Sequence, residues 1–254
     1  QGPPSARLRT GGSVKRRLNP ISRLGKQDLH GQAIALDTLK LSIIVPAFDE
    51  ELTILEVLRE VQAQRIDDVI FEVIVIDDGS KDATVTLLEE NPGLYSKLIK
   101  MEKNGGKGAA VKAGLSVASG DYVLFQDADL EYSPDEYKAL LMPVLRFDAD
   151  LVMSSRFAAP AYTRVAYFWN KIGNHLITLF FNILNNTTFT DIYSCYMLFR
   201  RDLVPTDKLK RMGWSQHAEI LSIAKRQARN IYEVPISYHG RTFEEGKKIR
   251  PYHV

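Results

Sequence analysis

Residues 121–134 read DYVLFQDADLEYSP and carry three structural signals in direct succession. The apolar start is typical of a buried strand, and the Ser-Pro pair at the end is typical of the first turn of a helix. Between them, Asp127, Asp129 and Glu131 occupy alternate positions, which point to the same side of an extended segment. Carboxylates gathered in this way repel one another unless a cation or a proton is present. The stretch therefore predicts either a metal site or a solvated acidic turn.

The same alternation of strand and helix continues on both sides of this stretch. Short apolar runs predict strands at 41–46, 71–77, 97–101, 121–126 and 148–155. Helical periodicity follows the first four of them, at 49–64, 80–90, 106–119 and 133–147. Alternation of this kind, with near-continuous apolar strands, is typical of a mostly parallel sheet with helices on both faces. The fold class is therefore predicted to be α/β.

Two details of these helices can be predicted from their sequences. Ser80 or Asp82 is the expected N-cap of the second helix, because both side chains accept hydrogen bonds from helix N–H groups. The residues expected on the buried side of the first helix, from their helical spacing, are Leu52, Leu55, Leu58 and Val61.

After residue 155 the pattern changes but still predicts regular structure. Residues 162–186 predict one or two amphipathic helices with aromatic side chains on one side, and 214–230 contain a further helix. Apolar runs at 194–200 and 231–238 predict two more strands. We expect this half to continue the same sheet and to supply the site of a second substrate.

The domain boundaries follow from composition. The chain of 254 residues has 45% hydrophobic and 25% charged residues, which is ordinary for one globular domain. Residues 1–38 carry seven Lys or Arg against two Asp and show no apolar periodicity, so we interpret them as a basic flexible extension. Residues 39–240 form the predicted single domain, and 241–254 a C-terminal tail.

Charge and hydropathy exclude several classes of protein. The net charge of +2 predicts no general affinity for nucleic acid, and the single cysteine, Cys195, excludes an internal disulfide. The most apolar stretch, 172–184, is too short and too polar to span a bilayer, which takes roughly 20 apolar residues. We expect a cytoplasmic protein. The basic extension and the aromatic stretch at 165–184 allow a peripheral position on the cytoplasmic face of a membrane, although a solvated tail and a packed helix explain the same residues.

Carboxylates gather where ligands bind in such a fold. Parallel sheets bind ligands beyond the carboxyl ends of their strands, and three predicted strands end in the acidic segments 46–50, 77–80 and 126–129. A random distribution of acidic surface residues would rarely place carboxylates after three separate strands. This favours a functional acidic site over a solvated turn.

The chain resembles the family-two inverting glycosyltransferases of the GT-A fold through seven motifs in sequence order: VPAFDEE, VIVIDDGSKDAT, NGGKGAAVKAG, GDYVLFQDADLEYSP, SSRF, TDIYSCYMLFRRDLV and YEVPISYHGRTFEEGKK. Among the branches of that family, it is most similar to dolichyl-phosphate mannose synthase and bacterial polyprenyl-phosphate glycosyltransferases. The resemblance covers about residues 41–248. It implies a Rossmann-like GT-A domain that uses a nucleotide-diphosphate sugar, of the UDP-glucose or GDP-mannose type, as donor.

The resemblance also assigns donor-binding roles. The segment 46–50 matches one that lines the nucleotide pocket, with Phe48 and Asp49 in place of the usual Tyr and Asn. The two acids at 77–78 match residues that accept hydrogen bonds from base and ribose, and Lys107 matches a position near the diphosphate. The donor-binding residues implied in this way are Pro46, Ala47, Asp49, Glu50, Asp77, Asp78, Lys107 and Asp127.

The resemblance also assigns a metal ion to the acidic motif at 127–131. Asp127 and Asp129 match the metal-binding DxD motif of the family, and Glu131 takes a position where some relatives complete the metal shell with Gln. The implied cofactor is Mg²⁺ or Mn²⁺, since both are hard cations that prefer oxygen ligands.

A lipid-phosphate acceptor would already be anionic, so it needs cations more than it needs a base. Arg156 in SSRF matches the arginine that holds the acceptor phosphate in the family, and an arginine fork suits phosphate. Arg164 and Arg200 are further candidates for this role.

A hydroxyl acceptor would instead lose a proton during attack, and a base would assist it. Asp191, His217 and Glu219 are the candidates. Relatives of the polyprenyl-phosphate branch carry an aromatic-Glu-Pro-Glu-Ile segment where this chain has 214–220, so His217 is a departure from the family. It is also a possible ligand of Mn²⁺.

Three functions follow from these observations. The leading hypothesis is metal-dependent, inverting transfer of a hexose from a nucleotide donor to a polyprenyl phosphate. The second keeps the donor chemistry but uses a hydroxyl acceptor, and the third is a nucleotide-sugar-binding protein without catalysis. A Rossmann dehydrogenase is excluded because no G-x-G-x-x-G follows the first predicted strand.

Overall fold

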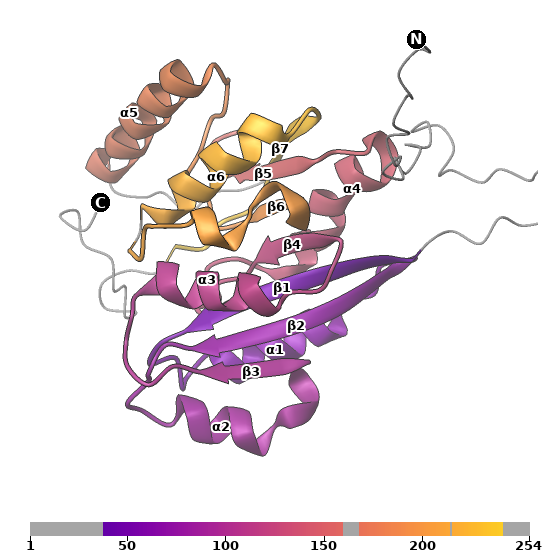
Figure 1. Ribbon diagram of the computed structural model, residues 1–254, viewed down its shortest axis with the longest axis vertical. Coiled ribbons are helices and arrows are strands. Elements are labelled where there is room, and N and C mark those ends of the chain that lie inside the picture. The colour runs from indigo at the N-terminus through magenta and orange to yellow at the C-terminus, as the bar shows by residue number, and fades with distance from the viewer. Residues whose placement is uncertain (1–37, 160–167, 214, 241–254) are drawn as a thin grey trace, which may run out of the picture.

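The computed structural model describes residues 38–159, 168–213 and 215–240 (Figure 1). The predicted basic extension and C-terminal tail lie outside these residues, except for residue 38, and so does the candidate acceptor residue Arg164. The predicted single domain, 39–240, falls within them apart from residues 160–167 and 214.

The strands of the described residues form one sheet in the order β3-β2-β1-β4-β6-β5-β7. Four of its six strand pairings are parallel, and both pairings of β6 are antiparallel. The prediction of a mostly parallel α/β sheet is therefore confirmed. The strand bounds are β1 (Leu39–Ala47), β2 (Val69–Asp77), β3 (Lys97–Lys100), β4 (Tyr122–Phe125), β5 (Leu151–Ser155), β6 (Met197–Arg200) and β7 (Ile231–Pro235).

Helices cover both faces of this sheet, as expected. In Figure 1, α3 and α6 lie in front of the sheet and α1 lies behind it, while α5 stands to one side. Tyr137 of α4 packs against Phe71 of β2, whereas Gly114 of α3 lies against Ile44 and Ile76. The helix bounds are α1 (Ile54–Ala63), α2 (Thr84–Glu90), α3 (Lys107–Val117), α4 (Tyr137–Phe147), α5 (Phe168–Asn185) and α6 (Gln216–Gln227), with short 3₁₀ turns at Pro92–Leu94, Pro134–Glu136, Arg201–Leu203 and Thr206–Lys208.

Of two predictions about the first helices, the one for α1 was right for Leu58 and Val61 and wrong for Leu52, and the N-cap prediction for α2 was wrong. Helix α1 begins at Ile54, so Leu52 precedes it and is 89% exposed; the buried side consists of Ile54, Val57, Leu58 and Val61. In α2 the N-cap position belongs to Ala83. Asp82 lies one residue earlier and accepts hydrogen bonds from the backbone N and Oγ1 of Thr84, so it still binds the first turn.

The predicted start of the fourth helix is a 3₁₀ turn, Pro134–Glu136, that leads directly into α4 at Tyr137. The Ser133 hydroxyl accepts a hydrogen bond from the Asp135 backbone N, at 3.3 Å, and Pro134 takes the first position of the turn.

The reversed direction of β6 decides where its flanking residues lie. Because β6 is antiparallel to β4, Arg200 pairs with Tyr122 at the beginning of β4, and Leu198 pairs with Leu124. Arg200 therefore lies at the sheet edge opposite to the end of β4. It forms ion pairs with Asp150, at 3.0 Å, and Asp202. The prediction that Arg200 contributes to the acceptor site was wrong, because its strand runs the other way.

Candidate active site

The carboxyl ends of β1, β2 and β4 meet at one edge of the sheet. Ala47 pairs with Asp77, and Ile44 pairs with Phe125 two residues before Asp127. The predicted gathering of acidic segments from three strands is confirmed. We call this edge the acidic rim: residues 46–50, 77–80 and 126–131.

The first two loops of the acidic rim are bound to each other. Asp49 has a left-handed backbone (φ 51°), and its Oδ1 accepts a hydrogen bond from the Lys81 backbone N at 2.7 Å. The Asp49 N donates to the Ser80 Oγ, and the Glu50 N donates to the Thr84 Oγ1. One oxygen of Asp49 thus joins the two loops, a contact that the Oδ1 of the Asn usual in the family could also make.

Asp77 and Asp78 are buried and bind backbone amides. The Asp77 carboxylate accepts from the N–H groups of Gly79 and Ser80. Asp78 accepts from Gly105 and Gly106, at 2.8 and 2.9 Å, and burial raises its pKa. Asp78 therefore holds the glycine loop that leads into α3 against the rim.

A groove of about 570 Å³ opens beside these acids. It lies beyond the ends of β2 and β3, where a parallel sheet binds ligands. Its lining residues are Asp77, Gly79, Ser80, Lys81, Val85, Lys100, Met101, Glu102, Lys103 and Asn104.

Lys107 and Asp127 form an ion pair at the centre of the rim. The Lys107 Nζ lies 2.5 Å from the Asp127 Oδ1, and both side chains are mostly buried. Burial opposes both charges, but each stabilises the other, so the pKa of Lys107 is raised and that of Asp127 is lowered. Asp127 is therefore an ionised carboxylate that already binds a cation.

The three acids of the opening motif diverge. The Asp129 Oδ1 accepts a hydrogen bond from the Glu131 backbone N at 3.1 Å, while the Glu131 Oε2 accepts one from the Tyr238 hydroxyl at 2.6 Å. In the described part of the chain, no three His, Cys, Asp or Glu side chains lie close enough to hold a metal ion. The three-carboxylate site expected from Asp127, Asp129 and Glu131 does not form, because Glu131 is directed to Tyr238.

Two carboxylates still fit a divalent cation. Asp127 and Asp129 follow β4 on the same turn, and Mg²⁺ commonly binds one or two carboxylates together with substrate phosphates. The residues present therefore suit an ion that arrives with a diphosphate.

Arg156 and Asp191 form the second ion pair of the site. The Arg156 Nε and one terminal nitrogen donate to the two Asp191 oxygens at 2.7 and 2.9 Å, and Asp191 is fully buried. The guanidinium lies over the rings of Phe157 and Tyr238. Burial works against its charge, but Tyr132 and Asp191 raise the pKa of Arg156 above its usual value. Arg156 is thus a rigidly held cation.

The other two candidate bases have different surroundings. The Glu219 carboxylate accepts hydrogen bonds from the backbone N atoms of Lys210 and Arg211. The His217 ring stacks on Tyr193, and its Nε2 is buried without a hydrogen-bond partner among the described residues. Burial, reinforced by the Lys107 charge, lowers the pKa of His217 to about 3.

Several residues of the site lie in the last two quoted motifs, but the sequence analysis gave them no role. Tyr238 binds Glu131 and covers Arg156, and Glu233 accepts hydrogen bonds from Thr190 and from the Asp191 N. The Cys195 thiol is buried and donates a long hydrogen bond, at 4.0 Å, to the Phe125 carbonyl at the end of β4. Their membership of these two motifs was the available signal, but it does not show which side chains they contact.

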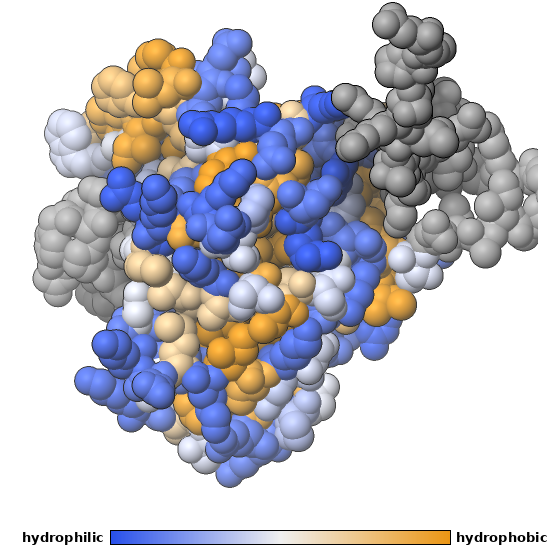
Figure 2. Space-filling model, in the orientation of Figure 1, coloured by the Kyte–Doolittle hydropathy of each residue, from blue (hydrophilic) through white to orange (hydrophobic). Residues whose placement is uncertain are grey.

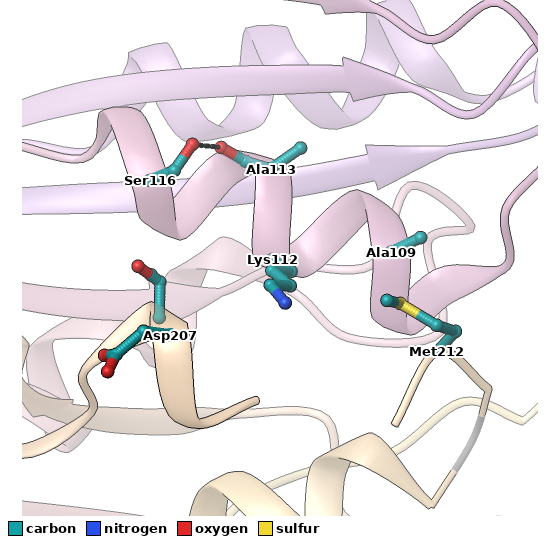
Figure 3. Close-up of a pocket in the computed structure, with 7 residues that line it drawn as sticks. Ala109, Lys112, Ala113, Ser116, Asp207 and Met212 are labelled. Atoms are coloured by element: carbon teal, nitrogen blue, oxygen red, sulfur yellow. Dashed lines mark hydrogen bonds between the residues drawn. The ribbon is translucent and has the colours of Figure 1, made fainter. Parts of the chain in front are cut away.

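A second groove, of about 430 Å³, lies between α3 and the 206–212 segment (Figure 3). Ala109 and Met212 lie at one end of it and Ser116 and Asp207 at the other. The Lys112 Nζ donates to the Leu209 carbonyl at 2.8 Å. None of the predicted site residues lines this groove.

The sequence model of glycosyl transferase family 2 matches residues 42–206, more than half of the chain. The chain belongs to this family. It is therefore a glycosyltransferase, as the seven motifs implied.

Curated relatives agree with this assignment. The chain is 31% identical to the low-salt glycan biosynthesis hexosyltransferase Agl6 of Haloferax volcanii, over 83% of this chain and 50% of that protein. It is 29% identical to the dolichyl-phosphate beta-glucosyltransferase of Dictyostelium discoideum (85% and 71% covered) and 29% identical to the UDP-N-acetylglucosamine–dolichyl-phosphate N-acetylglucosaminyltransferase of Methanococcus voltae (76% and 83%). The chain thus spans only half of the first of these. The resemblance to the polyprenyl-phosphate branch is confirmed.

The fold has counterparts among solved structures. Glucosyl-3-phosphoglycerate synthase from Mycobacterium tuberculosis, in complex with Mn²⁺, UDP and glucosyl-3-phosphoglycerate, aligns with a TM-score of 0.60 at 22% identity, over 82% of this chain and 74% of that chain. At this identity the likeness establishes the GT-A fold.

Proposed function

We propose that the protein transfers a hexose, with inversion, from a nucleotide-diphosphate sugar to a polyprenyl phosphate, with Mg²⁺ or Mn²⁺ as cofactor. We choose a phosphate acceptor because none of the three candidate bases, Asp191, His217 and Glu219, is suited to take a proton from a hydroxyl acceptor. Asp191 is bound to Arg156, Glu219 is bound to backbone amides, and the pKa of His217 is about 3. A hydroxyl acceptor needs a base near the working pH, whereas an ionised phosphate needs none.

Arg156 is the group that would hold the acceptor phosphate. A guanidinium has five N–H donors, and Asp191 takes up only those on Nε and one terminal nitrogen. The remaining donors suit a phosphate oxygen. Because Asp191, Phe157 and Tyr238 fix the guanidinium, little side-chain entropy is lost when the acceptor binds.

The acidic rim would hold the donor. We assign the groove beside Asp77 to the nucleoside, and the Asp127–Asp129 turn to the diphosphate and its cation. A divalent cation there would neutralise the charge that develops on the leaving diphosphate. Lys107 would move its ammonium from Asp127 to the diphosphate oxygens and so hold the leaving group as well.

The relatives support this choice of substrates. Those of Dictyostelium and Methanococcus are named for dolichyl phosphate, and a relative from Sodalis glossinidius, 28% identical, is named an undecaprenyl-phosphate transferase. The Methanococcus relative and the mycobacterial structure both involve uridine nucleotides. We therefore place a UDP-sugar first among the donors. A polyprenyl acceptor lies in a bilayer, so we also propose that the protein works at a membrane surface, on its cytoplasmic face.

The experiment that tests the proposal has two steps. Calorimetric titration of UDP-glucose and GDP-mannose, with Mn²⁺ and with EDTA, identifies the donor. Transfer is then measured to polyprenyl phosphate and to hydroxyl acceptors, for the wild type and Arg156→Lys. We expect metal-dependent binding of one donor and transfer to the phosphate alone, with the KM for polyprenyl phosphate raised about tenfold or more in Arg156→Lys, because a point charge replaces the fork. Transfer to a hydroxyl acceptor only, or an unchanged KM, would contradict the proposal.

A further inference from the structure

The most apolar face of α5 points away from the protein. Thr178 and Phe181 are its buried residues. At 100° per residue the large exposed side chains occupy one continuous arc of roughly 160° on the opposite side. We call this arc the α5 stripe. Its residues, with exposed fractions from 37% to 83%, are Phe168, Trp169, Ile172, Leu176, Leu179, Phe180, Ile183 and Leu184.

An arrangement of this kind is unusual for a helix of a soluble domain, which buries its apolar face. Single exposed apolar residues are normal, but a contiguous patch indicates an interaction surface. Figure 1 shows α5 to one side of the sheet, and Figure 2 shows hydrophobic atoms gathered over it. Large exposed apolar residues elsewhere in the described chain, such as Leu52 and Ile70, come from separate elements.

The α5 stripe belongs to a helix that contacts the residues next to Arg156 and Asp191. The ring of Phe157, next to Arg156, lies 4.8 Å from the His175 ring, and the Lys171 Nζ lies 5.7 Å from the Phe157 centroid. The Thr178 hydroxyl accepts a hydrogen bond from the backbone N of Ile192, next to Asp191. Helix α5 therefore joins the Arg156–Asp191 pair on its inner side to an apolar surface on its outer side.

The charge of this segment favours one occupant. Residues 168–190 contain no Asp or Glu, and Lys171 is their one formal charge. Trp169 and Phe168 lie in the first turn, and Trp in particular favours the boundary between lipid tails and headgroups. A stripe without acids, flanked by a lysine, suits a bilayer surface that contains anionic lipids.

We propose that α5 lies in the interfacial layer of a lipid bilayer, with the α5 stripe against the acyl chains. This position would bring Arg156 to the depth of lipid phosphates. The identity of the lipid that is presented to Arg156 rests on the proposed function, whereas the membrane contact itself does not.

Flotation with vesicles of phosphatidylcholine and phosphatidylglycerol in equal parts tests the membrane contact. The variant combines Leu176→Glu and Phe180→Glu, and the matched control is Ile70→Glu, which adds a charge at an exposed apolar residue of β2. We expect wild type and control to float with the vesicles and the double variant to lose at least about tenfold in the bound-to-free ratio. All three should share one urea midpoint, which shows that the variant is folded.

Two further measurements separate the alternatives. Sedimentation velocity without lipid should give the same monomer for all three proteins; a wild-type dimer that the double variant dissociates would assign the stripe to a second copy and overturn the proposal. Wild type that stays unbound to vesicles would also overturn it.

Transfer to a short, water-soluble prenyl phosphate should be equal in wild type and the double variant. If neither protein transfers to any phosphate while vesicle binding persists, the proposed function fails and the membrane contact stands.

Discussion

At the scale of single residues, the Lys107–Asp127 pair is the feature with the clearest consequence. The Lys107 ammonium is paired with the Asp127 carboxylate, which a divalent cation would also bind. It also lies in the first turn of α3, where the helix dipole disfavours a positive charge. A metal ion that bound Asp127 in the free enzyme would therefore have to compete with Lys107, and a diphosphate that received the ammonium would make the exchange easier. Metal and donor should bind cooperatively for this reason.

The variant Lys107→Met tests this coupling. Removal of the ammonium should tighten the binding of Mn²⁺ alone by about five- to tenfold, since a competing charge is lost, and should weaken the binding of the nucleotide. Electron paramagnetic resonance of free Mn²⁺, with and without UDP, measures both. Lys107→Arg, which keeps a cation, should resemble the wild type. An unchanged Mn²⁺ affinity in Lys107→Met would show that the pair does not compete with the metal.

At the scale of secondary-structure elements, Glu72 connects the strands at the edge opposite to the acidic rim. This nearly buried residue of β2 accepts hydrogen bonds from Ser42 of β1 and Lys97 of β3. It also binds the backbone N and the hydroxyl of Ser119, before β4. Burial opposes its charge, but these bonds lower the pKa of Glu72 far below its usual value.

Glu72→Gln should destabilise the protein by about 2–4 kcal/mol, because it removes a charged acceptor and leaves buried donors unpaired. In the wild type the lowered pKa makes this contribution complete above the unfolded-state value of about 4.5. It is lost progressively as the pH falls below that value. Urea unfolding at pH 7 and at pH 3 should show the difference between wild type and variant shrinking with acid. A difference that is equal at both values would be inconsistent with an ionised Glu72.

Two helical glycines should respond in opposite ways to alanine. In α5, a Cβ on Gly173 would meet nothing within 4 Å, so Gly173→Ala should stabilise by about 0.5–1 kcal/mol. In α3, a Cβ on Gly108 would lie 2.6 Å from the Met212 carbonyl oxygen, to which the Gly108 N donates. Gly108→Ala should therefore destabilise by about 1–3 kcal/mol. Urea midpoints of both variants check the pair, and stabilisation by Gly108→Ala would be the contrary result.

At the scale of the whole molecule, the pH dependence of transfer reflects the choice of acceptor. A phosphate monoester loses its second proton with a pKa of about 6. His217, with a pKa of about 3, stays neutral throughout the physiological range. The value of kcat/KM for the acceptor should rise through about pH 6 and stay level from pH 7 to 9. His217→Gln should keep the same profile. A rise that depends on His217 would identify it as a base and favour a hydroxyl acceptor.

The sheet and the acidic rim could be predicted from sequence because both follow from local periodicity. Alternating strands and helices place the ends of β1, β2 and β4 together whatever the details of packing. The side-chain pairings could not be predicted in the same way. Glu131 meets Tyr238 across 107 positions of sequence, and Arg156 meets Asp191 across 35. The direction of β6 could not be predicted either, because the apolar run at 194–200 is equally compatible with a parallel and an antiparallel strand.

The separation of the two sheet edges offers a practical means of oriented attachment. The chain has one cysteine, Cys195, whose thiol is buried and has a pKa raised well above its usual value, so it should react slowly with maleimides. Ile70 is 58% exposed and lies at the beginning of β2, away from the acidic rim. A single Ile70→Cys variant would therefore accept one fluorophore or one surface tether. Immobilised through it, the enzyme would present the groove beside Asp77, to which we assign the nucleoside, to the solution, which suits single-molecule recording of nucleotide capture.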